Sequence, residues 1–234
     1  MRRFVWVTVL LGCLGAARAE VGLSASASAS VCSKYVFRGQ VLGPLGLMGD
    51  ASLEVRPLPK LALRAYGWKY LRLDSGAKRL QEIDYDLSAT YRVLPKIDAT
   101  AGIVYYDNWH EQSDGNDTAE WYAGATLDLP GQPGLFVYTD YRNSVGTMIL
   151  GRASHTFATK LTRWSLDVSG EVGLHTRHTR HGFNHAQGRA ALTYDLGCGL
   201  SVGPAIDLYL TPESVDPARA RPVYSAALSW SRGF

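Results

Sequence analysis

The sequence predicts an all-β protein, a closed antiparallel up-and-down transmembrane β-barrel of about 12 strands. Three observations lead to this prediction. Apolar and polar residues alternate along most of the chain, short and longer connections follow one another in turn, and the chain ends on an aromatic residue. No stretch of the sequence shows a convincing helical period of 3.6 residues.

Residues 82–93 give the clearest alternation, with apolar side chains at the odd positions and polar or charged ones at the even positions. A period of two is typical of a strand with one apolar and one polar face. Similar runs predict strands at about 21–38, 50–57, 60–71, 80–94, 96–107, 117–129, 133–143, 147–159, 162–177, 184–196, 199–210 and 222–234. Many are longer than a usual soluble strand, and a strand needs roughly 9–11 residues to cross a membrane.

The run SASASAS at 24–30 is the plainest of these alternations. We expect its alanines to face lipid and its serines to face the lumen or a packed neighbouring wall. The run continues without a break into the strand-like VCSKYVF, which favours a strand. A flexible serine–alanine linker is the alternative.

The connections between the runs are of two alternating lengths. Short ones lie at 56–60, 94–96, 130–134, 159–163 and 196–199, and longer ones at 38–49, 72–79, 107–117, 142–147, 175–185 and 211–222. Outer-membrane barrels have short periplasmic turns and longer outer loops. The pattern therefore places both termini in the periplasm and the longer connections outside the cell.

The chain ends on Phe234, which closes the last alternating strand. This end resembles the C-terminal signature of outer-membrane barrels, and the resemblance implies that the barrel-assembly machinery reads Phe234. Arg232 departs from the pattern, because the signature usually has an aromatic or apolar residue there.

The first 19 residues predict a cleaved signal peptide, which leaves 20–234 as the barrel. Arg2 and Arg3 precede an apolar run, and residues 17–19 form an A-x-A cleavage site. A lipoprotein box ending at Cys13 is the alternative. Cleavage removes three arginines, so the basic count falls from 24 to 21 and equals the 21 acidic residues. A neutral chain lacks the basic footprint of a nucleic-acid binder, so we expect no nucleic-acid partner.

The export signal and the barrel pattern together predict the outer membrane of a Gram-negative bacterium, with membrane lipids around the chain. Aromatic residues near strand ends, among them Tyr35, Phe37, Trp68 and Tyr70, predict interfacial girdles. The mature chain keeps two cysteines at opposite ends of strands, so we expect two free thiols.

The polar faces of the strands predict the lining of the lumen. Glu82, Asp84 and Asp86 project to one side at intervals of about 6.6 Å, and burying three such charges dry costs several kcal/mol per ion. Water or passing cations relieve this cluster, which favours a narrow open lumen and a preference for cations. The candidate pore-lining residues are Glu82, Asp84, Asp86, Arg92, Asp167, Glu171 and Arg189. A lumen closed by salt bridges is the alternative, because barrels of about eight strands are filled by side chains.

Histidines at 175, 178, 181 and 185 gather in a predicted outer loop. Their spacing suits a metal, but no thiol or well-spaced carboxylate completes an ordinary zinc site. We therefore expect a solvated loop that touches anionic head groups or sugars, with no metal and no cofactor. Ser154 and His155 are adjacent, and neighbours in a strand point to opposite faces, so we expect no hydrolase pair and no enzyme activity.

Residues 33–39, SKYVFRG, resemble the N-terminal S-x-Y-x-F-R-G motif of the TorF-like family of outer-membrane porins. The matching residues are Ser33, Tyr35, Phe37, Arg38 and Gly39. A second segment, 117–129, resembles that family's internal E-x-Y-x-G strand through Glu120, Tyr122 and Gly124. The resemblance implies a small barrel that passes small solutes by diffusion, and it brings no established substrate. A non-conducting barrel with a structural or surface-interaction role is the alternative.

Overall fold

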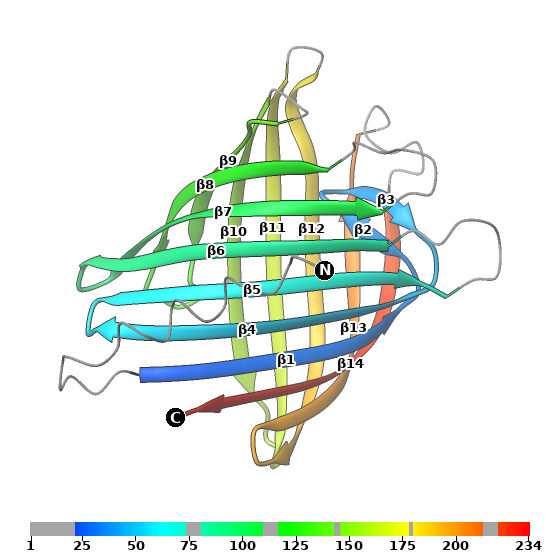
Figure 1. The fold of residues 1–234 in the computed structure, drawn as a ribbon. Coiled ribbons are helices and arrows are strands. Elements are labelled where there is room, and N and C mark those ends of the chain that lie inside the picture. Colours follow the sequence, from blue (N-terminus) through cyan, green and yellow to red (C-terminus); the bar gives the residue numbers. More distant parts are fainter. Residues whose placement is uncertain (1–21, 74–80, 110–116, 143–145, 178–179, 213–219) are drawn as a thin grey trace, which may run out of the picture.

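The computed structural model describes residues 22–73, 81–109, 117–142, 146–177, 180–212 and 220–234, and these form a closed antiparallel barrel of twelve strands (Figure 1). The predicted fold class is confirmed. The signal peptide predicted at 1–19 lies outside the described residues. In the described part of the chain, no helix has the length and apolar character needed to span a membrane.

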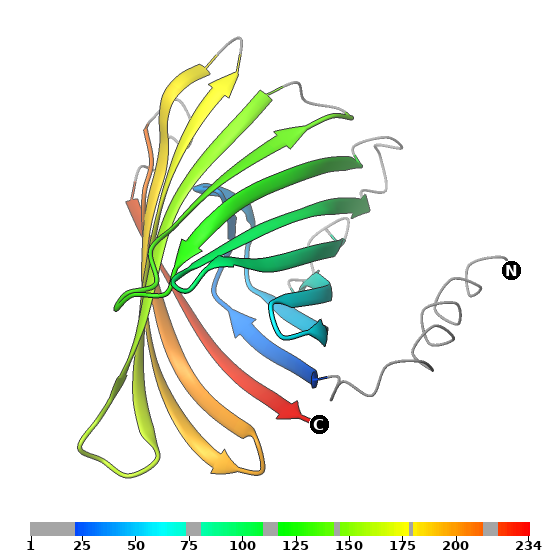
Figure 2. The same ribbon diagram turned by 90° about the vertical axis from the view of Figure 1, so that its left-hand side faces the viewer.

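The barrel strands follow one another around the wall in chain order (Figure 2). They are β1 (Gly22–Cys32), β4 (Gly46–Leu58), β5 (Leu61–Arg72), β6 (Gln81–Leu94), β7 (Ile97–Trp109), β8 (Thr118–Leu127), β9 (Gly134–Asp140), β10 (Gly146–Ala158), β11 (Trp164–Arg177), β12 (Arg180–Gly197), β13 (Leu200–Leu210) and β14 (Ala220–Gly233). The barrel closes where β1 pairs with β14, in register from Ser24 opposite Gly233 to Cys32 opposite Ser225.

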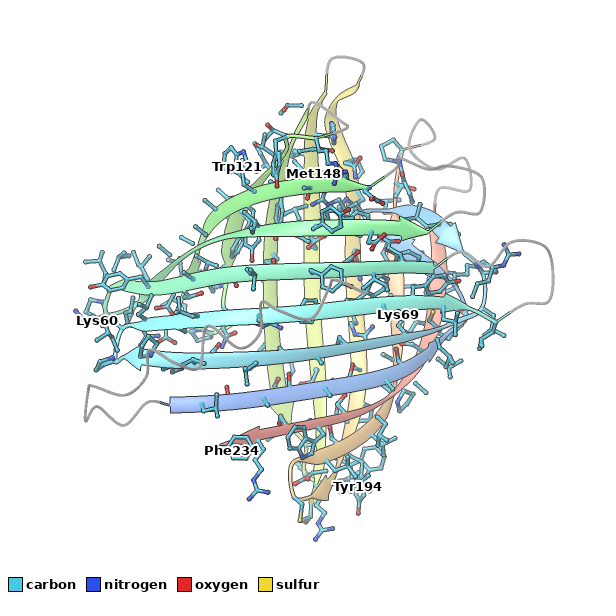
Figure 3. The ribbon with its side chains drawn as sticks, viewed as in Figure 1. Lys60, Lys69, Trp121, Met148, Tyr194 and Phe234 are labelled. Carbon is cyan, nitrogen blue, oxygen red and sulfur yellow. The ribbon has the colours of Figure 1, made fainter. Side chains whose placement is uncertain are left out.

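The two ends of the barrel differ in their connections. Both the start of β1 and the end of β14 lie at one end, which we call the short-turn end, together with tight turns such as 59–60 and 198–199. Figure 3 shows Phe234 and Lys60 there. The opposite end, which we call the long-loop end, carries the connections after β5, β7 and β13.

The alternation in β1 sorts its side chains between two environments. The hydroxyl of Ser26 lies 2.8 Å from that of Ser52, and Ser28 donates to Asp50, so the serines face inward. Ala27 and Ala29 are exposed on the outer face. The prediction for SASASAS is confirmed, because a linker would not pair with β4 and β14 along its length.

The outer face of the barrel is broadly apolar. Leu53, Leu87 and Ile103 are each about half exposed, with exposed fractions of 47%, 58% and 52%. A closed barrel with so much exposed apolar surface is stable where lipid covers that surface. Because the barrel is closed, the backbone N–H and C=O groups of each strand are hydrogen-bonded to its neighbours and none needs a partner from the lipid. The chain is therefore a transmembrane barrel.

Two predicted boundaries are wrong. The predicted strand 21–38 ends at Cys32, and its last residues form a separate strand, β2 (Tyr35–Phe37). The predicted loop 38–49 holds a further strand, β3 (Gln40–Gly43), which forms a two-stranded sheet with β2. The alternating pattern of VCSKYVF continued across a break in the barrel ladder, so periodicity alone did not reveal the end of β1.

The predicted histidine loop, 175–185, is also wrong for its described residues. β11 and β12 stay paired out to Arg177 opposite Arg180, past a register shift between Gly173 and Leu174. The connection between them is residues 178–179 alone. The backbone hydrogen bonds between these two strands continue past the last residues that alternate between apolar and polar. Strand residues that lie outside the hydrocarbon layer of the membrane do not need apolar side chains, so sequence alternation does not mark the end of the pairing.

Replacing Ala27 by Arg tests the in-out register of β1. Ala27 lies at the middle of its strand on the outer face, so the variant should lose about 2–4 kcal/mol of unfolding free energy in lipid vesicles. Ser26→Arg is the matched control and should lose about 1 kcal/mol, the value of one hydrogen bond. Urea unfolding measures both, and equal losses would contradict the register.

Candidate functional site: a hairpin inside the lumen

The short β2–β3 hairpin folds at a tight turn formed by Arg38 and Gly39. Both have positive φ, 48° and 80°, as the favoured two-residue hairpin turn requires. Glycine adopts this backbone freely, whereas arginine does so at a cost in conformational energy. The turn therefore needs contacts that hold Arg38 in place.

Aromatic stacking fixes the base of the hairpin against β5. The ring of Tyr35 lies 4.7 Å from that of Tyr70 and 5.1 Å from that of Trp68, centre to centre. Tyr70 and Cys32 are fully buried beside Tyr35. The Tyr70 hydroxyl donates to the carbonyl of Pro44 at 2.9 Å. These rings were predicted to form membrane girdles, and that prediction is wrong for them, because they pack inside the barrel.

Glycines let the hairpin approach the wall this closely. A Cβ at Gly43 would collide with the phenol of Tyr70, and one at Gly46 would collide with the same ring from the other side. Ser33 ties the start of the hairpin to β14, because its Oγ accepts a hydrogen bond from the Tyr224 N–H at 3.0 Å. The wall and the hairpin thus interlock at small residues.

The tip of the hairpin is held on the far side of the lumen. The guanidinium of Arg38 donates two hydrogen bonds of 2.6 Å to the carboxylate of Glu120 on β8. Four strands separate β8 from β1 along one side of the wall and six along the other, so the tip spans the barrel. The Asn184 amide of β12 donates to the Arg38 carbonyl at 2.9 Å.

Further contacts surround this ion pair. Phe37 meets Tyr106 of β7 edge-on at 5.6 Å, and the Tyr106 hydroxyl donates to Glu120 at 2.9 Å. Arg38 also lies over the ring of Tyr138 on β9, 5.0 Å from its centre. Burial lowers the pKa of Arg38, but the hydrogen bonds to Glu120 and the attraction of Tyr106, Glu120 and Tyr138 together outweigh it, so the net shift is upward and the guanidinium stays charged.

The predicted acidic row of β6 lies beside the hairpin. Glu82 is buried and accepts a hydrogen bond from the Tyr35 hydroxyl. Glu82, Glu120 and Arg38 are charged groups that act on Asp84, and its buried Oδ1 has no hydrogen-bond partner among the described residues. The positive charges that act on the row come from two elements: Arg38 of the hairpin acts on Asp84, and Arg64 of the neighbouring strand β5 acts on Asp86.

The other candidate pore-lining residues are spread along the wall. Arg92 pairs with Asp98 near the short-turn end at 2.8 Å, and Arg189 pairs with Asp207 at 2.7 Å. Asp167 accepts hydrogen bonds from threonines on both neighbouring strands. Glu171 lies 2.9 Å from the Nε2 of His185. The structure therefore places Glu82 and Asp84 beside the hairpin, whereas Asp86 interacts with Arg64 of β5. The remaining four form local wall contacts.

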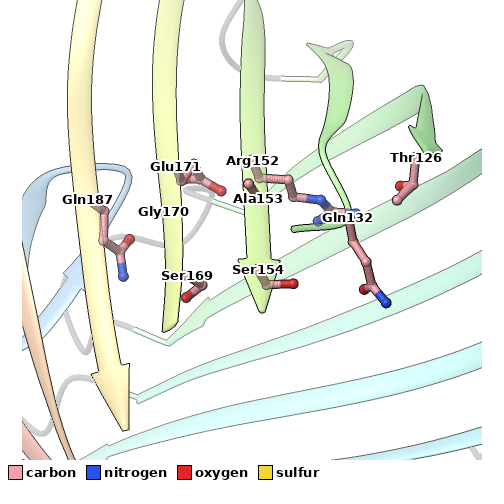
Figure 4. A pocket seen from close by; sticks show the side chains of 9 residues that line it. All are labelled: Thr126, Gln132, Arg152, Ala153, Ser154, Ser169, Gly170, Glu171 and Gln187. Carbon is pink, nitrogen blue, oxygen red and sulfur yellow. The ribbon is translucent and has the colours of Figure 1, made fainter. Parts of the chain in front are cut away.

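Cavities lie on both sides of the hairpin. One of about 240 Å³ is lined by Arg38, Glu120 and Asp140 among others, towards the long-loop end. A second of about 390 Å³ lies deeper and is lined by hydroxyl, amide and charged side chains, including Arg152, Ser154 and Gln187 (Figure 4). A third of about 420 Å³ opens beside Ser24 and Arg64 at the short-turn end.

Ser154 lines the deeper cavity, whereas His155 is exposed and packs edge-on against Phe157 at 4.4 Å. The two side chains do not form a nucleophile and base. Among the described residues, no three histidine, cysteine or acidic side chains are grouped closely enough to hold a metal. Cys32 and Cys198 are both free, as predicted.

The geometry defines a class of protein: a twelve-stranded transmembrane barrel whose lumen is crossed by a hairpin near one end. No family model matches the chain, and no curated protein matches it. Solved structures with a similar fold include the KdgM porin, at 10% identity and a TM-score of 0.53, covering 88% of this chain and 98% of that one. The values are the same for the KdgM porin in complex with disordered oligogalacturonate.

The CymD monoaromatic hydrocarbon channel is a further solved structure, with 8% identity, a TM-score of 0.49, and coverage of 91% of this chain and 88% of that one. The likeness to the KdgM porin concerns the fold, because so few residues are identical.

Replacing Glu120 by Gln tests the anchor of the hairpin tip. The side chains of Arg38 and Glu120 are only 16% and 8% exposed, so the variant leaves a nearly buried cation without its carboxylate. We expect a loss of about 3 kcal/mol in unfolding free energy. Asp98→Asn breaks the more exposed pair with Arg92 and should lose less than about 1 kcal/mol. Similar losses in the two variants would contradict the anchor.

Proposed function

We propose that the chain is a porin-like channel of the outer membrane, through which small solutes diffuse past the β2–β3 hairpin. The observation that carries the proposal is the polar lumen, which holds one cavity beside the hairpin towards the long-loop end and two more towards the short-turn end. If side chains filled the barrel, we would expect an apolar core without polar cavities on both sides of the hairpin. Apolar packing stabilises a closed core better than buried polar and charged groups do.

The charges beside the hairpin support a preference for cations. Glu82, Asp84 and Glu120 lie beside the hairpin and its single arginine, Arg38, so acidic groups outnumber the basic one there. A ring of carboxylates favours cations in a water-filled pore. Small solutes and cations are therefore the proposed cargo.

We further propose that the chain reaches the outer membrane after a signal peptide is cleaved, with both termini in the periplasm. Its exposed apolar wall suits membrane lipids. The exposed Phe234, whose N–H donates to the Leu23 carbonyl at the seam, is the proposed signal for the barrel-assembly machinery. Membership of the TorF-like family stays a prediction that rests on the SKYVFRG motif, and a channel role fits it.

A non-conducting barrel is the second candidate, and the hairpin itself favours it. The tip is bonded to β8 and β12 and the base is stacked on β5, which is how a plug is held. Single-channel recording of the purified protein separates the two functions, because a plugged barrel passes no ions.

Replacing Asp84 and Asp86 together by Asn tests the cation preference. The two substitutions remove two carboxyl groups from the acidic row of β6, so the reversal potential in a salt gradient, measured at alkaline pH where carboxyl groups are ionised, should move towards zero. The matched control replaces Asp128 and Asp195, two acids at the short-turn end, by Asn and should leave the potential almost unchanged. An anion-selective wild type, or an equal shift in both variants, would overturn the preference.

Epitope tags at 114 and 130 test the orientation. The first site lies between β7 and β8, outside the described residues, and the second lies in the β8–β9 turn at the short-turn end. On intact cells an antibody should label the tag at Asp114 and not the tag at Pro130. Labelling of both, or of the second alone, would contradict periplasmic termini.

A further inference from the structure

His185 of β12 is a buried histidine directly behind the tip of the hairpin. Its side chain has no exposed surface. A Cβ at Gly39 would lie 2.7 Å from the Cβ of His185, so the turn is seated against this residue. We propose that His185 is a positioning residue that holds the hairpin when neutral and weakens that hold when protonated.

Two hydrogen bonds link His185 to the hairpin through Asn184. The Nδ2 of Asn184 lies 2.9 Å from the Nδ1 of His185 and 2.9 Å from the carbonyl oxygen of Arg38. On the other side of the ring, Nε2 lies 2.9 Å from the Oε1 of Glu171. The chain of contacts thus runs from Glu171 through His185 and Asn184 to Arg38.

These contacts select one protonation state. An amide nitrogen only donates hydrogen bonds, and a carbonyl oxygen only accepts them, so both N–H bonds of Asn184 are directed at acceptors. The Nδ1 of His185 must therefore carry no proton. Its Nε2 carries the proton of the neutral ring and donates it to Glu171.

A second proton on His185 breaks this arrangement. The new Nδ1–H would point at the Asn184 amide nitrogen, which has no lone pair to accept it. If the Asn184 amide flips over, its oxygen accepts a hydrogen bond from the imidazolium. The same oxygen then faces the carbonyl oxygen of Arg38, and the two acceptors repel each other. The backbone of the hairpin tip loses its donor, while Glu171 stabilises the charged ring.

The groups that face His185 come from four elements. Glu171 and, further along the same strand, His175 lie on β11, Arg38 lies on the hairpin with its guanidinium committed to Glu120, and Tyr209 lies on β13 near Glu171. Arg152 of β10 is paired in register with Glu171. Two of these groups, His185 and His175, are imidazoles, so a test must separate one from the other.

Hydrogen exchange of the purified protein in detergent micelles tests the proposal without requiring ion flow. Exchange of the amides of residues 35–43 is compared at about pH 7.5 and about pH 5.5, on either side of the usual range of imidazole. Each variant is referred to a reference peptide at the same pH, which removes the intrinsic effect of pH on exchange. In the wild type the corrected exchange should rise roughly fivefold at the lower pH, the factor for loss of one hydrogen bond.

Three histidine variants assign the response. His185→Gln should remove the rise, because its amide does not titrate. His175→Gln and the outer-face variant His155→Gln should keep it. A rise that survives in His185→Gln, or that disappears in His175→Gln, would overturn the proposal.

Asn184→Ala gives a second route if His185→Gln does not fold. This variant lacks the link from the ring to the Arg38 carbonyl, so its hairpin should exchange faster at both pH values and show no further rise. A full pH response in Asn184→Ala would overturn the proposed link. Current fluctuations of single channels should follow the same pattern, and only this last readout depends on the proposed channel function.

Discussion

Backbone hydrogen bonding in lipid is the constraint on which the rest of this structure depends. Hydrocarbon offers no partner for an unpaired N–H or C=O group, so the strands must close on themselves. The pairing of β1 with β14 completes that closure. In the closed barrel, the alternation of side chains along each strand directs every second one to the lipid and the others to the lumen. Backbone pairing on both sides also keeps β1 in the wall, although its middle consists of serines and alanines and has no large apolar residue.

The hairpin is formed by the connection between β1 and β4, which turns inward. β1 and β4 stay paired up to Cys32 opposite Gly46, so the residues between them leave the wall and return to it at one place. Arg38 at the turn of this segment has a strained backbone conformation. Its positively charged side chain is also nearly buried. Glu120, Asn184 and the aromatic rings offset these costs, and in doing so they fix the position of the hairpin across the lumen.

The sequence predicted the barrel well because strand periodicity and connection length are local signals. Most strand boundaries fell within a few residues, and the inward serines of β1 followed from alternation alone. The hairpin could not be found in this way, because its own residues continue the alternation of β1. Its partners are also remote in sequence, Glu120 at a separation of 82 residues and Asn184 at 146.

The acidic row of β6 is visible in the sequence, because its three carboxyl groups alternate on one strand. Arg38, which lies beside the row, belongs to a different element, and no spacing in one sequence joins the two. The SKYVFRG motif, quoted above for a family resemblance, covers residues that lie together in the structure. It marked Ser33, Tyr35, Phe37, Arg38 and Gly39 as a unit, and the structure places all of them in the hairpin or at its base.

Shortening the hairpin tests most directly whether it narrows a conducting lumen. Because Cys32 and Gly46 are paired, residues 34–44 can be replaced by a two-glycine turn that joins β1 to β4 without moving either strand. Circular dichroism confirms that the barrel is retained. The account predicts that single-channel conductance then rises severalfold above that of the full chain. Equal conductance in the two proteins, or no ion current in either, would contradict it.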